Sequence, residues 1–152
     1  MNAPTPEMTG ETSLMMRRTF DADMPTLWAA LTDPQAWLQW FGAQMATPQR
    51  TEADLRPGGK WAIEMQGNES GEPHNVRGEF VEIDEPNRVS FTWAWYSAPD
   101  AVSLVTYVLT DAGDGRTSLL LTHEKLPNAD QRDGHGRGWM ATLESLENYL
   151  SA

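Results

Sequence analysis

The sequence of 152 residues contains no cysteine. Disulfide bonds, catalysis by a thiolate and zinc sites with cysteine ligands are therefore excluded. No apolar run approaches the roughly 18 residues that would cross a membrane. The first residues, MNAPTPEMTGETS, have neither the basic region nor the apolar stretch of a secretory signal. We therefore expect a cytoplasmic protein without a membrane span.

Positive charge is scarce, because 11 Lys and Arg stand against 22 Asp and Glu, which gives a net charge of -11. Such a chain repels phosphate backbones, and its Lys and Arg do not gather in one segment, so we expect no nucleic-acid partner. The three histidines, His74, His123 and His135, are never three or four residues apart, so they do not form a helical pair of metal ligands. We expect no metal and no cofactor.

Recognisable catalytic and nucleotide motifs are also missing. No GxSxG stretch occurs, which counts against an α/β-hydrolase mechanism. GDGR at 113–116 joins two predicted strands. GHGRG at 134–138 leads into a predicted helix but lacks the lysine and the preceding strand of a nucleotide loop. We assign no catalytic residue.

Two short helices follow a first strand in the predicted fold. The polar residues 1–12 are predicted to form a flexible N-terminal tail, and residues 13–152 a single domain. SLMMRRTF at 13–20 alternates as a strand. Asp23 and Asp33 each precede a proline and an apolar helical pattern, so we expect them to cap two consecutive helices.

Alternating strands and one long helix fill the rest of the chain. Residues 49–55 and 60–66 flank the turn RPGG, which predicts a hairpin. Further strands are predicted over 75–84, with a bulge at Gly78, and over 88–95, 101–110 and 117–126. Trp139, Leu143, Leu146 and Leu150 recur at helical spacing. The pattern predicts an α+β domain in which a curved antiparallel sheet wraps a C-terminal helix.

Tryptophan is abundant, with 7 residues, and RVSFTWAW at 88–95 places Phe91, Trp93 and Trp95 on one face of a strand. Each ring that buries about 150 to 250 Å² contributes at most about 4 to 6 kcal/mol. Exposing all three would cost an amount comparable to the roughly 5 to 15 kcal/mol stability of a whole domain. The rings must face inward, under the helix.

Five stretches in order resemble the START-like (SRPBCC) superfamily and, within it, homologues of the activator of heat-shock protein 90 ATPase. They are RRTFDADMPTLWAALTDPQAWLQWFG, DLRPGGKWAIEM, GEFVEIDEPNRVSFTWAW, GRTSLLLTHEKL and GRGWMATLESLENYL. The resemblance extends from about Arg17 to the C-terminus. It implies the helix-grip fold, so residues 13–152 would form one START-like domain, with a cavity between the sheet and the long helix. Its members include lipid carriers, polyketide cyclases and co-chaperone domains, so it implies the fold more firmly than the function.

The large inward side chains either fill the core themselves or line this cavity, and in the second case a few polar groups would orient a ligand there. His123 shares the predicted inward face and is either a hydrogen-bonded core histidine or a ligand contact. Arg18 also faces inward and needs either a carboxylate of the protein or a polar ligand. The predicted ligand-binding residues, besides Arg18 as a polar contact, are Trp40, Phe41, Trp61, Ile63, Phe91, Trp93, Trp95, Tyr107, His123, Trp139 and Leu143.

Three functions fit these observations. The first, which we prefer, is a non-catalytic domain that binds a small apolar or aromatic molecule. The second is a co-chaperone-like domain whose acidic surface contacts a chaperone and stimulates its ATPase. The third is an enzyme like the polyketide cyclases and dehydratases, with His123 or Tyr107 as the acid or base. An unpaired edge strand, or exposed Met and Trp near the cavity, would support a homodimer.

Overall fold

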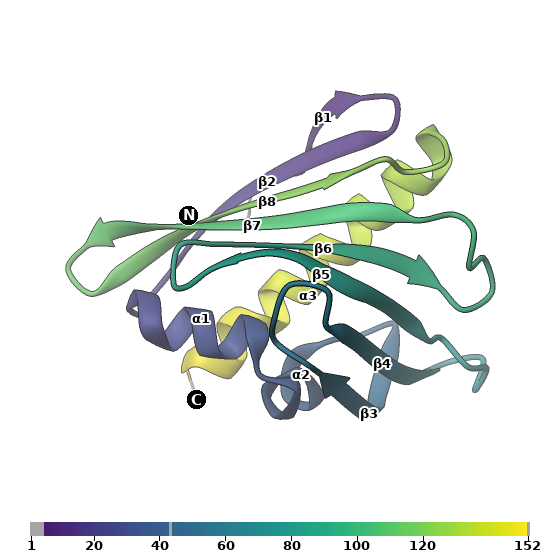
Figure 1. Cartoon of the computed structure of the whole chain (residues 1–152), viewed down its shortest axis with the longest axis horizontal. Helices are drawn as coiled ribbons and strands as arrows, with labels where there is room; N and C mark the ends of the chain where they lie inside the picture. Colours follow the sequence, from purple (N-terminus) through teal and green to yellow (C-terminus); the bar gives the residue numbers. More distant parts are fainter. Residues whose placement is uncertain (1–4, 43, 152) are drawn as a thin grey trace.

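An eight-stranded antiparallel sheet curves around one long helix in the computed structural model (Figure 1), which describes residues 5–42 and 44–151. The strand order is β1-β2-β8-β7-β6-β5-β4-β3, so β3 to β8 form a meander and β2 pairs with β8. The strands are β1 Glu7–Gly10, β2 Ser13–Phe20, β3 Ala46–Ala53, β4 Lys60–Gly67, β5 Val76–Asp84, β6 Arg88–Trp95, β7 Ser103–Gly113 and β8 Arg116–Glu124. The helices are α1 Met24–Thr32, α2 Pro34–Trp40 and α3 Ala129–Ser151. The predicted α+β helix-grip architecture is confirmed.

The two short helices begin where the capping residues predicted. The side chain of Asp23 accepts a hydrogen bond from the backbone N–H of Thr26 at 3.0 Å, and that of Asp33 accepts one from Gln35 at 2.9 Å. Each acceptor satisfies one backbone donor that the first turn of a helix leaves free. Asp33 is both the C-cap of α1 and the N-cap of α2.

The predicted N-terminal tail contains a strand. Glu7–Gly10 pairs with β2, with Glu7 opposite Met15 and Met8 opposite Leu14. The prediction of a flexible tail is wrong for these residues, because β2 offers an edge on which the polar EMTG segment can hydrogen-bond without burying side chains. Residues 1–4 of the expected tail lie outside the described part of the chain.

Gly78 does not mark a bulge, contrary to the prediction. The register of β5 and β6 shifts between Phe80 and Glu82 instead. A Cβ atom at Gly78 would lie 1.8 Å from the backbone oxygen of Thr92 and 2.6 Å from the Trp61 indole nitrogen. Glycine is needed here because two neighbouring groups approach the backbone more closely than a side chain allows.

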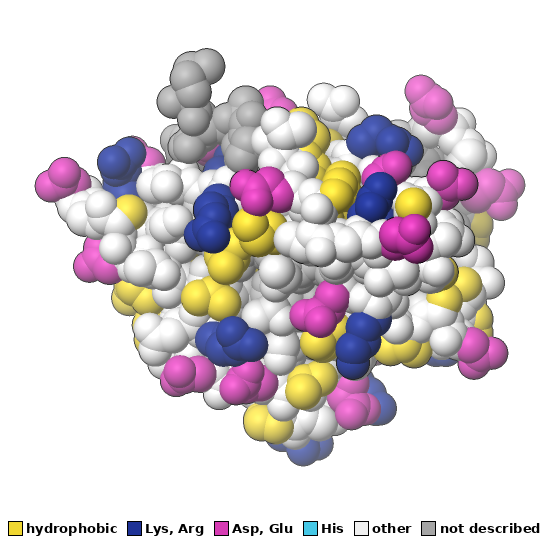
Figure 2. Space-filling model, turned by 90° about the horizontal axis from the view of Figure 1, so that it is seen from above, with side chains coloured by type: hydrophobic (Ala, Val, Ile, Leu, Met, Phe, Trp, Pro, Cys, Tyr) yellow, Lys and Arg dark blue, Asp and Glu magenta, His cyan; other side chains and the backbone are white. Residues whose placement is uncertain are grey.

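Side chains of both signs are interspersed on the outer surface, as Figure 2 shows for one face. Ion pairs connect neighbouring strands: Arg50 pairs with Glu64, Lys60 with Glu79 and Arg88 with Glu82. All of these side chains are substantially exposed, so each pair contributes little to stability. Within the described residues, no helix is both long and apolar enough to cross a membrane.

Candidate ligand-binding cavity

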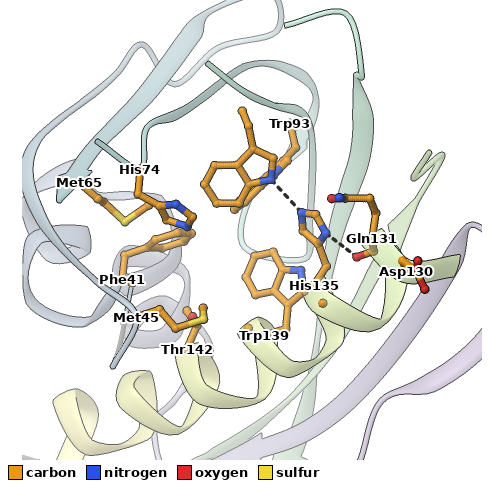
Figure 3. Close-up of a pocket in the computed structure, with 14 residues that line it drawn as sticks. Phe41, Met45, Met65, His74, Trp93, Asp130, Gln131, His135, Trp139 and Thr142 are labelled. Atoms are coloured by element: carbon orange, nitrogen blue, oxygen red, sulfur yellow. Dashed lines mark hydrogen bonds between the residues drawn. The ribbon is translucent and has the colours of Figure 1, made fainter. Parts of the chain in front are cut away.

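A cavity of about 270 Å³ opens between the concave face of the sheet and the first half of α3. Its walls are largely aromatic (Figure 3), and the rings come from four separate parts of the chain: Phe41, His74, Trp93, Trp95, His135 and Trp139. Met45, Met65 and Thr142 fill the spaces between these rings. Far-apart segments of the chain therefore build one apolar pocket with few polar groups, which is the usual composition of a small-molecule site.

The rings of the wall support one another. The ring centroids of Trp93 lie 5.5 Å from Trp139, 5.4 Å from Trp95 and 6.0 Å from Phe41. Phe41 and Trp139 meet edge to face at 6.2 Å. Tilted and edge-to-face contacts at these distances are favourable. They favour this arrangement of the rings, so the cavity wall is formed before any ligand arrives.

Two glycines of α3 keep the floor of the cavity open. Gly134 and Gly138, one helical turn apart, both line it. A Cβ at Gly138 would meet the Met45 methyl at 3.2 Å, whereas a Cβ at Gly134 would meet only the Arg137 guanidinium, at 3.8 Å. These glycines belong to GHGRG, which lies within α3 because the helix already begins at Ala129. The expectation that this stretch precedes the helix is wrong.

His135 stands in the wall as a neutral ring. Its Nε2 accepts a hydrogen bond from the indole N–H of Trp95 at 3.0 Å, so its Nδ1 carries the proton and donates to the backbone oxygen of Gln131 at 2.7 Å. Burial lowers the pKa of His135 below its ordinary value, although the hydrogen bond to Gln131 opposes this. A charged imidazole would lose the Trp95 bond, because both of its nitrogens would be donors.

His123 lies behind the wall and does not line the cavity. It is fully buried, and its Nδ1 accepts the indole N–H of Trp139 at 3.0 Å. Its Nε2 donates to the hydroxyl of Ser103 at 2.7 Å, and that hydroxyl donates to the backbone oxygen of Trp93. Burial, and secondarily the nearby His135, hold the pKa of His123 well below its usual value. Both ring nitrogens are thus engaged, and the residue positions Trp139.

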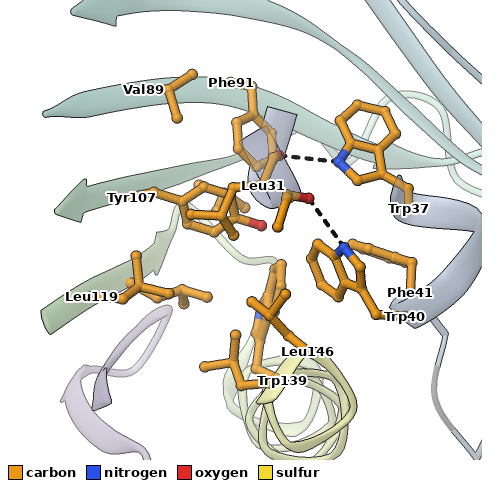
Figure 4. Close-up of a cluster of buried hydrophobic side chains, with 14 of the residues drawn as sticks. Leu31, Trp37, Trp40, Phe41, Val89, Phe91, Tyr107, Leu119, Trp139 and Leu146 are labelled. Carbon is orange, nitrogen blue, oxygen red and sulfur yellow. Dashed lines mark hydrogen bonds between the residues drawn. The ribbon is translucent and has the colours of Figure 1, made fainter. Parts of the chain in front are cut away.

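Four of the predicted ligand-binding residues reach the cavity: Phe41, Trp93, Trp95 and Trp139. Most of the others pack into the core beneath it (Figure 4), where Trp61, Phe91 and Tyr107 surround a gap of only about 20 Å³. Trp61 and Phe91 are 5.4 Å apart there, and Phe91 and Tyr107 are 5.2 Å apart. The residues that the structure places in this core are Trp40, Trp61, Ile63, Phe91, Tyr107 and Leu143.

Arg18 is also away from the cavity. Its Nε and Nη2 both donate to one carboxylate oxygen of Glu147 near the end of α3, at 3.2 and 3.1 Å. The arginine is 8% exposed, so it needs this partner. The structure thus places the inward cation in an ion pair between the sheet and the long helix.

Sequence reasoning missed several lining residues: Gly42, Met45, Met65, His74, Asp130, Gln131, Gly134, His135, Gly138 and Thr142. The glycines at 134 and 138 were the available signal, because each glycine inside a helix costs about 1 kcal/mol and needs a reason. His74 and Met45 come from loops whose place depends on the whole fold. The described residues contain no group of three His or acidic side chains that could hold a metal ion.

Trp93 adds one polar feature to this site. It is 5% exposed, and its indole N–H is the only buried side-chain nitrogen or oxygen of the described residues without a hydrogen-bond partner. An unsatisfied buried donor costs about 1 to 3 kcal/mol. The indoles of Trp37, Trp40, Trp61, Trp95 and Trp139 all have acceptors. Among the described residues, Trp93 is therefore the member of the aromatic wall with an unsatisfied polar group.

The curved sheet, the long helix that it encloses and the cavity between them define a START-like, helix-grip protein. More specifically, the family model of "Activator of Hsp90 ATPase homolog 1-like protein" matches residues 21–151. The chain belongs to this family, as its sequence resemblance predicted. No curated protein matches the sequence.

Solved structures with the same fold include proteins of several organisms. The AHSA1 protein of Silicibacter pomeroyi is 28% identical, with a TM-score of 0.80 over 91% of this chain and 97% of that one. CalU16 from Micromonospora echinospora is also 28% identical, with a TM-score of 0.70 over 99% of this chain and 85% of that one. An HSP90 activator from Plasmodium falciparum is 24% identical, with a TM-score of 0.72 over 92% and 96%, and shows the shared fold alone.

Proposed function

We propose that this protein binds a small, largely apolar aromatic molecule in the cavity between the sheet and α3, without transforming it chemically. One observation carries the proposal: a ring-lined space of about 270 Å³ is present, whereas the neighbouring core around Phe91 leaves a gap of only about 20 Å³. That volume is near the lower end of the roughly 300 to 1,000 Å³ typical of ligand sites. We therefore expect ligands with about two fused rings.

The described geometry supports binding better than catalysis. The two acid or base candidates, His123 and Tyr107, are 0% and 2% exposed and do not line the cavity. Burial also raises the pKa of Tyr107 above its ordinary value, which makes its hydroxyl a poorer proton donor. A general acid or base must come within hydrogen-bond reach of the reacting atom. Neither candidate of the cyclase-like alternative meets this condition in the cavity, and both ring nitrogens of His135, which does line it, are already in hydrogen bonds.

Native mass spectrometry of freshly purified protein tests the binding function. We expect an additional small-molecule mass in the native spectrum that disappears on denaturation. In Gly134→Leu, where the new side chain extends into the cavity, this mass should be lost. Glu144→Leu introduces the same side chain at an exposed position of α3 and should keep it.

An empty native spectrum would need a second test, because the ligand can be lost in purification. The tryptophan fluorescence of the wild type should then change on titration with 2-naphthol, and that of Gly134→Leu should not. An empty spectrum together with unchanged wild-type fluorescence would rule the proposal out.

A second candidate function is stimulation of a chaperone ATPase. The observation in its favour is membership of the Hsp90 ATPase activator family, together with a net charge of -11 that would attract a basic surface of a partner. Such contact would use the outer surface of the domain. It is therefore compatible with a ligand in the cavity and requires a separate test.

A further inference from the structure

A second hollow of about 230 Å³ adjoins the cavity. It is bounded by the loop after β6, the start of β7 and the segment that leads into α3. Ser97, Ser103 and Asn128 line it, so its walls are more polar than those of the aromatic cavity. Trp93, Trp95, Gln131 and His135 line both spaces. The two hollows therefore adjoin one another at these four side chains.

We propose that Trp95 and His135 form a partition between the aromatic cavity, here the first compartment, and the second hollow, here the second compartment. This pair then sets the length of ligand that the protein accepts. The inference rests on the proposed binding function and assigns a second subsite to it. An accepted ligand has an aromatic part that fits the first compartment, and a longer molecule reaches the polar second compartment only when the partition opens.

The partition is the more exposed part of the wall. Trp95 and His135 are both only half-buried and are joined by a single hydrogen bond of 3.0 Å. His135 in turn donates to the backbone oxygen of Gln131 in its own helix (Figure 3). Trp95 is the last residue of β6, where the chain leaves the sheet. By contrast, Trp93 and Trp139 in the same wall are at least 95% buried. The more exposed of these side chains are thus the two between the hollows.

The surroundings of Trp95 also point to a preferred closed position. His74 packs on the indole with ring centroids 4.4 Å apart, and Trp93 meets it edge to face at 5.4 Å. His74 lines only the first compartment, whereas His135 lines both. Removing His135 should therefore join the two spaces. Removing His74 should only widen the first.

Two matched probes test this inference: 2-naphthol, with two fused rings, and 6-phenyl-2-naphthol, which adds one ring along the same axis. We expect wild-type protein to prefer the short probe, and His135→Ala to bind the long probe about tenfold more tightly than wild type does. Affinity for the short probe should change less than about threefold. His74→Ala, the matched control, should not gain affinity for the long probe.

A double variant tests whether the second compartment is used. Ala101 lines only the second hollow, so Ala101→Leu in the His135→Ala background should fill it and remove the gain for the long probe. Equal affinity of wild type and a folded His135→Ala for the long probe would overturn the partition, and so would a gain that survives Ala101→Leu. Thermal unfolding establishes that each variant is folded.

The short probe separates the two proposals. Binding of 2-naphthol to wild type, without the predicted gain for the longer probe in His135→Ala, would overturn the partition alone. Absence of binding of either probe to wild type and to His135→Ala would count against the cavity as a binding site, and the partition would fall with it.

Discussion

At the scale of single residues, burial keeps two histidines neutral, and each accepts a hydrogen bond from an indole N–H. Trp139 donates to His123, and Trp95 donates to His135. Burial penalises the charge of an imidazolium, and an imidazole that accepts such a bond also cannot be protonated without losing it. The aromatic wall therefore depends on the neutral state of these rings.

This dependence predicts that stability falls in mild acid. The pKa of His123 lies well below 6.5 in the folded protein, so only the unfolded chain takes up a proton as the pH falls through about 6.5. The free energy of unfolding should be fully retained above that pH. Below that pH, the free energy of unfolding should decrease by up to about 1.4 kcal/mol per pH unit for each histidine that is protonated only in the unfolded chain.

Urea denaturation between pH 7.5 and pH 5.5, a range above the usual titration of carboxylates, measures this slope. His123→Gln should reduce the slope, whatever its effect on stability at neutral pH. His74→Gln should retain most of it, because His74 is exposed and its pKa is lowered only by partial burial. Identical slopes in wild type and His123→Gln would contradict the prediction.

At the scale of elements, glycines have opposite roles in the sheet and in the long helix. Gly78 in β5 leaves room for the backbone of Thr92, which approaches too closely for any side chain. Gly134 in α3 faces the cavity and has no close neighbour. The first glycine is required for the fold, whereas the second weakens its helix and keeps space for a ligand.

We predict that Gly134→Ala stabilises the protein by up to about 1 kcal/mol, because alanine favours the helical backbone and its methyl group meets no obstacle. Affinity for a cavity ligand should fall at the same time. Gly78→Ala should act in the opposite direction and destabilise by at least about 2 kcal/mol, because its Cβ would overlap Thr92. Chemical denaturation measures both changes, and a destabilised Gly134→Ala would refute this account of α3.

At the scale of the whole molecule, the binding cavity and the charged surface are separate features. The acidic excess lies on an exterior where several Arg and Lys are already held in cross-strand ion pairs. A basic partner would therefore meet a negatively charged exterior without entering the cavity. The two candidate functions can be tested independently for this reason.

If the protein stimulates a chaperone ATPase, we expect the stimulation to depend on ionic strength. Raising the salt from about 0.1 M to about 1 M shortens the Debye length from about 10 Å to about 3 Å and should remove most of the stimulation. Gly134→Leu, which blocks only the cavity, should stimulate as well as wild type. Basal ATPase activity at each salt concentration is the control. No stimulation of Hsp90 at low salt would eliminate this candidate.

The fold could be read from the sequence because its signals are local. Capping aspartates, prolines at the start of helices, turn glycines and alternating apolar residues predicted both short helices, the main strands and the long helix. Resemblance to the family added the helix-grip arrangement. The exceptions were β1, whose polar residues carry no strand pattern, and Gly78, whose close contact comes from a neighbouring strand.

The site was only partly predictable, for a physical reason. Alternation shows that Phe91 and Trp93 face the same way, but not whether the space beyond each ring is filled. Tertiary packing decides whether that space is filled. Trp61 and Tyr107 pack against Phe91, whereas Gly134 and Gly138 of α3 have no side chains and leave a space beside Trp93. The sequence by itself determined which side chains turn inward, because periodicity is local. Only the tertiary structure decided which of them meet a cavity, because an empty space depends on every segment around it.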